Sequence, residues 1–332
     1  MSSLCLCGEK NYENQLEKSM ENDKITAQLK SLDEKYSLTG QDLSANLEGL
    51  LHADYLRYWD YIHVDTLLTL QKPRTNIPDE LIFIGYHQIT ELYFRLILWE
   101  MEQIANQKDI KSAYLVDKMQ RICRYMGLLV QSFDVMVDGM DVEQFKQFRM
   151  ALLPASGFQS AQFRMIEVCS TDFKNLVNKE FKANINENTT LQEMYEHVYW
   201  KQGATETATG KRTITLAHFE TKYALSLQHL ANDYKNKNLW KKFSEIKPED
   251  ENFSLLKELY RKYDNLVNIQ WTMAHLRSAG KYLTQQKKAG EAAVAVPATG
   301  GTNWTKYLPP RYQKRIYFPE LWSKEEKENW GL

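Results

Sequence analysis

The sequence predicts an all-α protein, and three observations lead to that fold class. Long segments repeat apolar residues at the spacing of a helix, notably 78–101, 110–138 and 251–283. Strand signals are confined to short runs such as 212–216. No interval of the chain repeats itself, which argues against a helical solenoid. We therefore expect one large helical core built from long, bundle-like helices.

Residues 78–101 predict the helix around which the rest of the chain is organised. Asn76 and Pro78 suit the cap and the first turn of this helix. Apolar residues cover almost all of its faces, so we expect it to be buried. His87 lies within it, one turn before Glu91. Taken alone, His87 fits either a core histidine paired with Glu91 or an imidazole that faces a pocket.

The segments before this helix differ in character. Residues 1–50 are polar and predict an arm that becomes ordered against another subunit. Residues 51–332 predict the helical domain. Aromatic residues are concentrated shortly after residue 50, at Tyr55, Tyr58, Trp59 and Tyr61. Such a concentration suits either core packing or a stacking wall for a planar ligand.

A break between two helices is predicted at residues 154–160, PASGFQS. Proline and glycine interrupt the helical pattern there, and Ser156 or Ser160 suits the N-cap of the next helix. Phe145 and Arg149 lie one turn apart just before the break. Arg149 fits either an ion-paired surface residue or a fixed guanidinium that binds a carboxylate.

The last third of the chain contains a second long helix with a lone histidine. Within residues 251–283, Tyr260 and Val267 belong to a buried stripe, and His275 lies with Trp271 along a neighbouring line. Taken alone, His275 is most simply a core residue. The glycine-rich segment that follows predicts a loop able to close over a pocket.

Composition excludes several classes of partner and compartment. The 42 basic and 43 acidic residues and a pI near 6.7 give no electrostatic case for nucleic acid or an anionic membrane. Charged residues within the apolar runs argue against a membrane span. Four scattered cysteines make no disulfide framework, and no signal peptide is recognisable, so we expect a cytoplasmic protein. Its partners should be small molecules or copies of itself.

Several common catalytic arrangements are absent from the sequence. It has no glycine-rich phosphate loop, no H-E-x-x-H and no G-x-S-x-G. No histidine follows a glutamate by three residues, which excludes a di-iron bundle. Two isolated helical histidines among many aromatic residues remain. One arrangement that uses them is a haem, in which one imidazole binds iron and a polar side chain lies on the other face.

Four blocks of the sequence resemble the tryptophan 2,3-dioxygenase family. They are YWDYIHVDTLLTLQ, FIGYHQITELYFRLILWE, FRMALLPASGFQSAQFRMIE and ATGG, in the family's order. The resemblance extends from about Tyr55 to the C-terminal region and is weaker over 170–250. It implies an all-α homotetramer that uses haem b and O2 to cleave the indole C2–C3 bond of L-tryptophan. The product is N-formylkynurenine, which makes this the first step of the kynurenine pathway.

The resemblance also implies roles for single residues. His275 corresponds to the proximal iron ligand, and His87 to the distal imidazole that hydrogen-bonds the indole N–H. Arg149 corresponds to the residue that binds the substrate carboxylate. The other matches are Phe83 and Phe145 as indole-pocket walls, Thr299 at the substrate ammonium and carboxylate, Ser156 beside the haem, and Tyr58, Tyr61 and Ile62 as a segment from a neighbouring subunit.

Three features depart from the family's usual sequence. Thr272 stands where the family usually has arginine, ATGGTNW replaces GTGGSSG, and the connection from His275 to Thr299 is longer. They bear on loop closure and substrate selectivity more than on haem binding. The alternative functions are a haem enzyme for another aromatic amino acid, such as a tyrosine hydroxylase, and a non-catalytic haem or tryptophan sensor. The retained pocket aromatics favour an indole.

Overall fold

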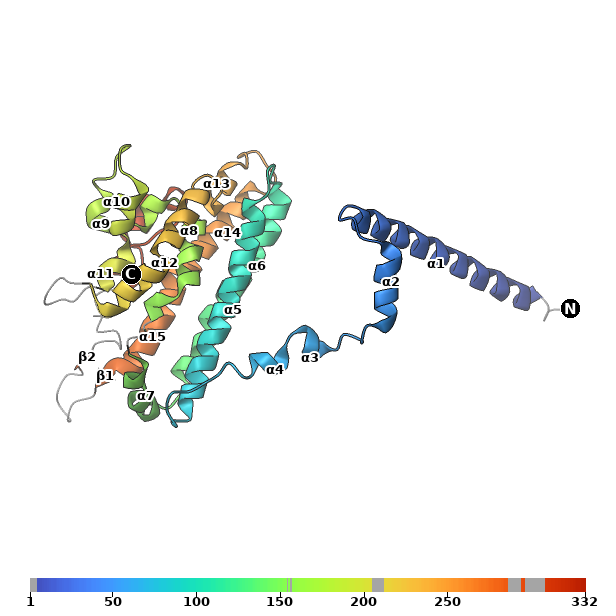
Figure 1. Ribbon diagram of the computed structural model, residues 1–332. Coiled ribbons are helices and arrows are strands. Elements are labelled where there is room, and N and C mark those ends of the chain that lie inside the picture. Colours follow the sequence, from blue (N-terminus) through green and yellow to red (C-terminus); the bar gives the residue numbers. More distant parts are fainter. Residues whose placement is uncertain (1–4, 154, 156, 205–211, 286–293, 296–307) are drawn as a thin grey trace. The chain divides into compact units, whose positions relative to one another are not determined.

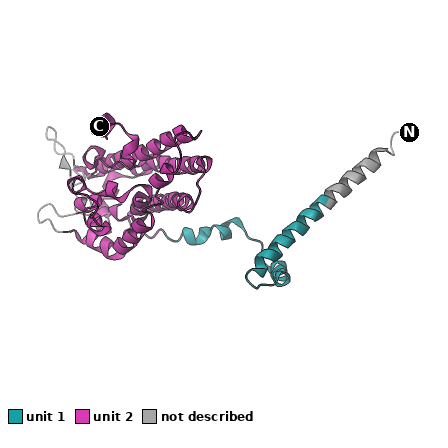
Figure 2. Ribbon diagram, turned by 90° about the horizontal axis from the view of Figure 1, so that it is seen from above, with its two compact units in different colours: residues 1–70 teal, residues 71–332 magenta. Residues whose placement is uncertain are grey.

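The computed structural model describes residues 5–153, 155, 157–204, 212–285, 294–295 and 308–332. Contacts divide the chain into two compact units, Met1–Leu70 and Gln71–Leu332, which Figure 2 colours separately. The described residues are mainly helical, so the all-α prediction is confirmed. One short antiparallel pair accompanies the helices, β1 (Thr284–Gln285) with β2 (Val294–Ala295).

The first unit consists of helices α1 (Cys5–Ser37), α2 (Leu43–His52), α3 (Tyr58–Tyr61) and α4 (Val64–Leu67). Asp42 caps α2, because its carboxylate accepts hydrogen bonds from the backbone N–H groups of Ser44 and Ala45. Helices α2, α3 and α4 contain no buried residue. This part of the chain therefore has no hydrophobic core of its own among its described residues.

Among its described residues, the second unit has six helices of ten or more residues. They are α5 (Asp79–Ala105), α6 (Ser112–Val137), α8 (Ala161–Ser170), α12 (Ile214–Asp233), α14 (Phe253–Asn265) and α15 (Trp271–Leu283). The short helices are α7 (Val142–Phe148), α9 (Lys179–Lys182), α10 (Leu191–Glu196), α11 (Tyr199–Gly203), α13 (Leu239–Ser244), α17 (Pro310–Gln313) and α18 (Lys324–Glu328). Single turns are η1 (Arg149–Leu152), η2 (Gly157–Gln159), η3 (Phe173–Leu176), η4 (Leu266–Gln270) and η5 (Pro319–Leu321). No helix in the described ranges has the length and hydropathy needed to cross a membrane.

Helix α6 packs against α5, α14 and α15, and lies beside α5 in Figure 1. Its buried side chains recur every three or four residues, at Leu115, Met119, Ile122, Met126 and Leu129. Helix α8 packs between α5 and α12. The organising helix predicted from the sequence is therefore present as α5, and its inward face joins this common core. The expectation that almost all of its faces are buried is wrong for this chain, because Leu81, Ile89 and Leu92 are at least half exposed.

The start of α5 is built differently from the sequence expectation. Pro78 precedes the first turn, and no side chain caps the helix at that position. The carboxylate of Glu80 instead turns back and accepts hydrogen bonds from the backbone N–H groups of Arg74 and Thr75, each at 2.8 Å. Asn76 is thus not needed as a cap, because Glu80 fixes the chain entering the helix.

Two reciprocal hydrogen bonds tie the start of α5 to the start of α7. The backbone N–H of Asp79 donates to Gln144 Oε1 at 3.2 Å. The backbone N–H of Asp141 donates to Asp79 Oδ2 at 2.6 Å. This link holds the turn that carries Phe83 beside the turn that carries Phe145, and the two ring centroids are 6.1 Å apart.

The structure shows which residues cap the starts of α8 and α12. Ser160 caps α8, and its hydroxyl accepts from the backbone N–H of Phe163 at 3.3 Å. Thr213 caps α12 in the same way through Leu216 at 3.3 Å. The short strand signal at 212–216 does not form a strand of the sheet, because the β-branched residues around Ile214 lie in the first turn of this capped helix, as the all-α prediction requires.

The second long helix is present but contains a turn that the sequence pattern does not reveal. Between α14 and α15, η4 is a π-helical turn in which the backbone N–H of Trp271 donates to the carbonyl of Leu266, five residues back. An α-helix advances about 100° per residue, so one additional residue in a turn redirects every later side chain by roughly that angle. His275 lies one turn beyond this point.

Candidate active site

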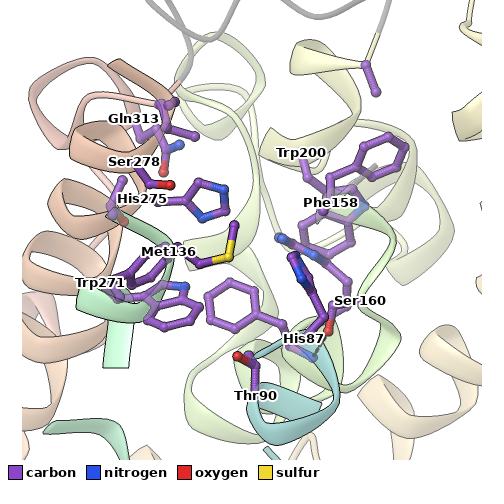
Figure 3. Close-up of a pocket in the computed structure, with 18 of the residues that line it drawn as sticks. His87, Thr90, Met136, Phe158, Ser160, Trp200, Trp271, His275, Ser278 and Gln313 are labelled. Atoms are coloured by element: carbon purple, nitrogen blue, oxygen red, sulfur yellow. Dashed lines mark hydrogen bonds between the residues drawn. The ribbon is translucent and has the colours of Figure 1, made fainter. Parts of the chain in front are cut away.

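A deep cavity of about 680 Å³ lies within the second unit. Its walls come from α5, α6, α7, α8, α11, α15 and the segment around α17. Such a volume is in the range of sites that bind a cofactor or a drug-sized ligand. Figure 3 shows His87 and His275 on either side of the space, with aromatic residues between and around them.

His87 is held in one tautomer by its own helix. Its Nδ1 lies 2.7 Å from the backbone carbonyl oxygen of Phe83, one turn earlier. Because a carbonyl oxygen only accepts, Nδ1 carries the proton and Nε2 carries the lone pair. Burial lowers the pKa of His87, and the hydrogen bond to Phe83 and the charge of Glu91 offset this only in part. The ring is therefore neutral and offers a hydrogen-bond acceptor to the cavity that it lines.

Aromatic rings form the wall next to His87. The Phe83 ring lies 4.2 Å from the His87 ring between centroids, and Phe145 extends the same wall. The ring centroid of Phe145 in turn lies 4.6 Å from that of Tyr282 on α15. Flat apolar surfaces beside one hydrogen-bond acceptor suit a planar aromatic ligand that carries a single N–H donor.

His275 occupies a different wall, on α15. Its ring packs beside Phe133, with the centroids 5.4 Å apart, and edge-on to Trp271 at 6.4 Å. The pKa of His275 is lowered to about 4, mainly by burial and in smaller part by the nearby His87 and Arg164. The imidazole is thus neutral at physiological pH, which is the form that ligates a metal.

Gly157 lies close to the His275 ring. A Cβ atom placed on Gly157 would lie 3.8 Å from His275 Cε1, in ordinary van der Waals contact. The described residues contain no group of three or more histidine, cysteine, aspartate or glutamate side chains that could hold a bare metal ion. His275 offers one neutral imidazole nitrogen on the wall of this cavity, which is the donor that a haem iron takes from a protein.

The polar end of the cavity is formed by two arginines. Arg164 donates to Glu167 Oε2 at 2.6 Å and to the Tyr199 hydroxyl at 2.6 Å. Arg315 donates to Glu167 Oε1 at 2.8 Å. Arg164, Glu167 and Arg315 are all buried, so two guanidinium groups of the cavity share one carboxylate. The sequence analysis missed this cluster, although the three-residue spacing of Arg164 and Glu167 on one helix could have indicated it.

Comparison with known proteins agrees with this geometry. Residues 49–290 match the sequence model of the family described as tryptophan 2,3-dioxygenase. The chain belongs to that family. A tryptophan 2,3-dioxygenase of Bacillus thuringiensis subsp. konkukian is 25% identical over 304 residues, which cover 85% of this chain and 97% of the relative.

Shorter regions show higher identity to other members of the tryptophan 2,3-dioxygenase family. A relative of that name from Anaeromyxobacter sp. is 36% identical over 117 residues, or 35% of this chain and 44% of the relative. Another from Polaromonas naphthalenivorans is 39% identical over 115 residues, or 34% of this chain and 40% of the relative. The family is haem-dependent, in agreement with the single-imidazole donor set.

The structure brings together four of the residues that the family resemblance indicates. Phe83, His87, Phe145 and His275 all line the cavity. Arg149 does not line it among the described residues; it begins η1, one turn after Phe145. Its side chain is half-buried, and burial lowers the pKa of its guanidinium.

The remaining site residues predicted from the sequence cannot be compared with the cavity in the same way. Ser156 and Thr299 lie outside the described residues. Tyr58, Tyr61 and Ile62 belong to the first unit, where their side chains are 73%, 70% and 38% exposed. Exposed aromatic residues in a unit without a core are consistent with a surface that another chain covers.

Proposed function

We propose that this chain is a tryptophan 2,3-dioxygenase that oxidises L-tryptophan with O2 to N-formylkynurenine. The observation that carries the proposal is the pair of neutral imidazoles, His87 and His275, on two walls of one largely aromatic cavity. The reaction is inferred from membership of the family. The cavity is lined by side chains suited to binding a haem and an indole. The same reaction begins the kynurenine pathway of tryptophan catabolism.

His275 is the residue that would hold haem b, through a bond from its imidazole to the iron. A haem bound there supplies the redox chemistry that activates O2. The aromatic rings of Phe133 and Trp271 pack beside His275 and help to fix the orientation of its imidazole. Ser156, by the family resemblance, is a second neighbour of the haem.

His87 is proposed to orient the substrate. With Nδ1 committed to the Phe83 carbonyl, Nε2 accepts a hydrogen bond from the indole N–H. Phe83 and Phe145 then pack against the faces and edges of the indole ring. A planar ring held by one hydrogen bond and two aromatic walls has little rotational freedom, which lowers the entropic cost of aligning the C2–C3 bond for reaction.

The amino-acid end of the substrate requires charged and polar partners. Arg149 is proposed to bind its carboxylate through a charge-assisted, two-pronged hydrogen bond. The support is its position one turn after Phe145, at the edge of the aromatic wall, together with the family resemblance. Thr299 is proposed from the resemblance alone to contact the ammonium and carboxylate groups.

The active form is proposed to be a homotetramer in which a neighbouring subunit supplies Tyr58, Tyr61 and Ile62. Support comes from an exposed apolar stripe along α5, formed by Ile89, Leu92, Leu96 and Trp99, each 44% to 54% exposed. A contiguous stripe of this kind typically marks a protein–protein interface. Residues 1–50 are proposed as an intersubunit arm and 51–332 as the dioxygenase domain, and the family match begins at residue 49.

A cytoplasmic location is also proposed. Cys123 and Cys169 are buried and are free thiols in the described chain. Burial raises the pKa of the Cys123 thiol to about 12, so it remains protonated and unreactive. Unpaired thiols are typical of proteins in a reducing compartment.

The test is to reconstitute the purified chain with haem b, reduce it, and add L-tryptophan and air while recording the absorbance spectrum. The proposal expects a haem Soret band and growth of N-formylkynurenine absorbance. A parallel reaction with L-tyrosine distinguishes a haem enzyme for another aromatic amino acid. A haem band without turnover of either amino acid would indicate a sensor, and a protein that takes up no haem would refute the assignment of His275.

A further inference from the structure

The π-helical turn η4 contains a buried asparagine whose amide is anchored on both sides. Asn268 is 2% exposed. Its Nδ2 donates to Asp264 Oδ1 at 2.6 Å, and its Oδ1 accepts a hydrogen bond from Arg315 Nε. Asparagine is a poor helix former in a helix interior, so its place here needs a reason beyond helix propensity. The two anchors supply it, because they satisfy both halves of the amide.

Asp264, the first anchor, is fixed by the C-terminal segment. It is fully buried and accepts hydrogen bonds from the backbone N–H groups of Tyr317 and Phe318, at 3.0 and 3.1 Å. Trp322 Nε1 donates to the same carboxylate at 3.0 Å. The C-terminal segment therefore holds the Asp264 carboxylate in place. If the π turn changed its pitch, Asn268 would move and Asp264 would not move with it.

Arg315, the second anchor, connects the π turn to the cavity wall. It is 6% exposed, lines the cavity and donates to Glu167 of α8 at 2.8 Å. Its Nε donates to Asn268. The amide of Asn268 is thus held between α14 and the C-terminal segment, and that segment is itself bonded to α8.

The π turn decides which way the next turn of helix faces. π-helical geometry is less favourable than α-helical geometry and persists where neighbouring groups hold it, frequently at functional sites. If the turn relaxed to α-helix, the side chains after it would rotate by roughly 100°. Trp271 and His275, which both line the cavity, would then point elsewhere.

We infer that Asn268, clamped between Asp264 and Arg315, is a positioning residue that directs His275 into the cavity by stabilising the π turn. The inference rests on the proposed function in one respect, namely that His275 binds the haem iron. Asn268 itself has no contact with the haem in this assignment. Asn268 affects His275 by fixing which face of α15 points into the cavity. Arg315, which bonds Asn268, connects the π turn to the cavity wall.

The experiment compares two buried Asn→Leu variants in the full-length chain reconstituted with haem b. Asn268→Leu removes the clamp. Asn175→Leu is the matched control, because Asn175 is 6% exposed and donates to the Thr171 hydroxyl and to the carbonyl oxygen of Tyr317 at 2.9 and 3.3 Å. The control thus loses a buried amide bonded to the same C-terminal segment but leaves η4 intact.

Two readouts separate positioning from general stability. The Fe–His stretching band in the resonance Raman spectrum of the ferrous protein reports the orientation of the axial imidazole. We expect this band to shift in Asn268→Leu and to stay at the parent position in Asn175→Leu. Haem retention should fall about tenfold in Asn268→Leu, as is usual when a residue that orients a metal ligand is lost. An unshifted band in folded Asn268→Leu, or an equal shift in the control, would overturn the inference.

A second variant and a haem-free measurement keep the test decisive. If Asn268→Leu does not fold, Arg315→Lys retains the charge beside Glu167 but lacks the Nε donor, and the same shift is expected. Hydrogen exchange of the α15 amides in the haem-free chain should be faster in Asn268→Leu than in Asn175→Leu. This last result does not depend on haem, so a parent protein that binds no haem would refute the proposed function while the role of Asn268 is still tested.

Discussion

The two long helices that carry the candidate histidines fix them by different means. In α5, an uninterrupted α-helix places His87, and the Phe83 carbonyl one turn earlier sets its tautomer. In the helix that ends with α15, the direction of His275 follows from a π turn, and groups at Asp264 and Arg315 hold that turn. One histidine is specified locally, and the other depends on contacts between distant parts of the sequence, such as that between Arg315 and Asn268, 47 residues apart.

This difference predicts how the position of each histidine side chain should respond to mutation. The tautomer of His87 needs only an intact helix, since a backbone carbonyl cannot be mutated away. The orientation of His275 needs a buried polar network, and such networks fail when one member is lost. Changes far from His275 should therefore affect it, whereas His87 should respond mainly to changes within α5.

The largest effect is expected when His275 itself is removed. His275→Ala deletes the proposed iron ligand and should abolish stable haem binding. Haem titration followed at the Soret band measures this. His229→Ala, at an exposed position on α12, is the control and should bind haem like the parent. Normal haem content in His275→Ala would refute the ligand assignment.

Removal of His87 should produce a large effect of a different kind. His87→Ala should keep its haem, yet turn over L-tryptophan about 10²-fold more slowly, because the indole loses the group that orients it. Haem content and steady-state turnover, measured on one preparation, separate binding of the cofactor from catalysis. A variant as fast as the parent would remove His87 from the mechanism.

A smaller effect is expected at Arg149, which lies at the edge of the aromatic wall. Arg149→Ala should weaken L-tryptophan binding by about 1.5–3 kcal/mol, the value of a hydrogen bond to a charged group. The change should appear mainly in KM and in the Kd from substrate-induced spectral shifts. Lys146→Ala removes an exposed cation that pairs with Glu143 on the preceding turn and should leave both values unchanged. An unchanged Kd in Arg149→Ala would contradict its role.

The smallest effect is expected at Glu80, which fixes the chain that enters α5. Hydrogen bonds from Thr75 and from the backbone of Arg74 outweigh burial and hold the pKa of Glu80 below its usual value of 4.5. A lowered folded-state pKa means that ionised Glu80 stabilises the fold above pH 4.5 and that this stabilisation disappears as the pH falls through its folded-state pKa. Glu80→Gln should therefore lower Tm at pH 7, and the difference from the parent should shrink in acid. A pH-independent difference would exclude ionisation as its cause.

Much of the fold followed from the sequence because its signals are local. The spacing of apolar residues predicted the helices that became α5 and α6, and hydroxyl side chains predicted caps such as Ser160. The motifs also selected His87 and His275, which the fold brings to one cavity. Their roles remain predictions until haem and substrate are tested.

The features missed by sequence reasoning depend on distant contacts. A π turn of five residues differs from an α turn by one residue, which the apolar spacing of residues 251–283 cannot distinguish. Glu167 reads as a polar residue near the end of a helix, yet it is fully buried between two arginines, one of them 148 residues away. Arg149 shows the converse, because a matching motif did not place its side chain on the described cavity wall.

The paired hydrogen bonds between Asp79 and the start of α7 have a mechanical consequence. They join the first turns of α5 and α7, and Phe83 and Phe145 follow within about one further turn. The backbone turns that carry the two rings are therefore coupled, because moving one helix start away from the other would break both hydrogen bonds. We expect this coupling to keep the aromatic wall of the cavity in one arrangement, against which a planar ligand is aligned.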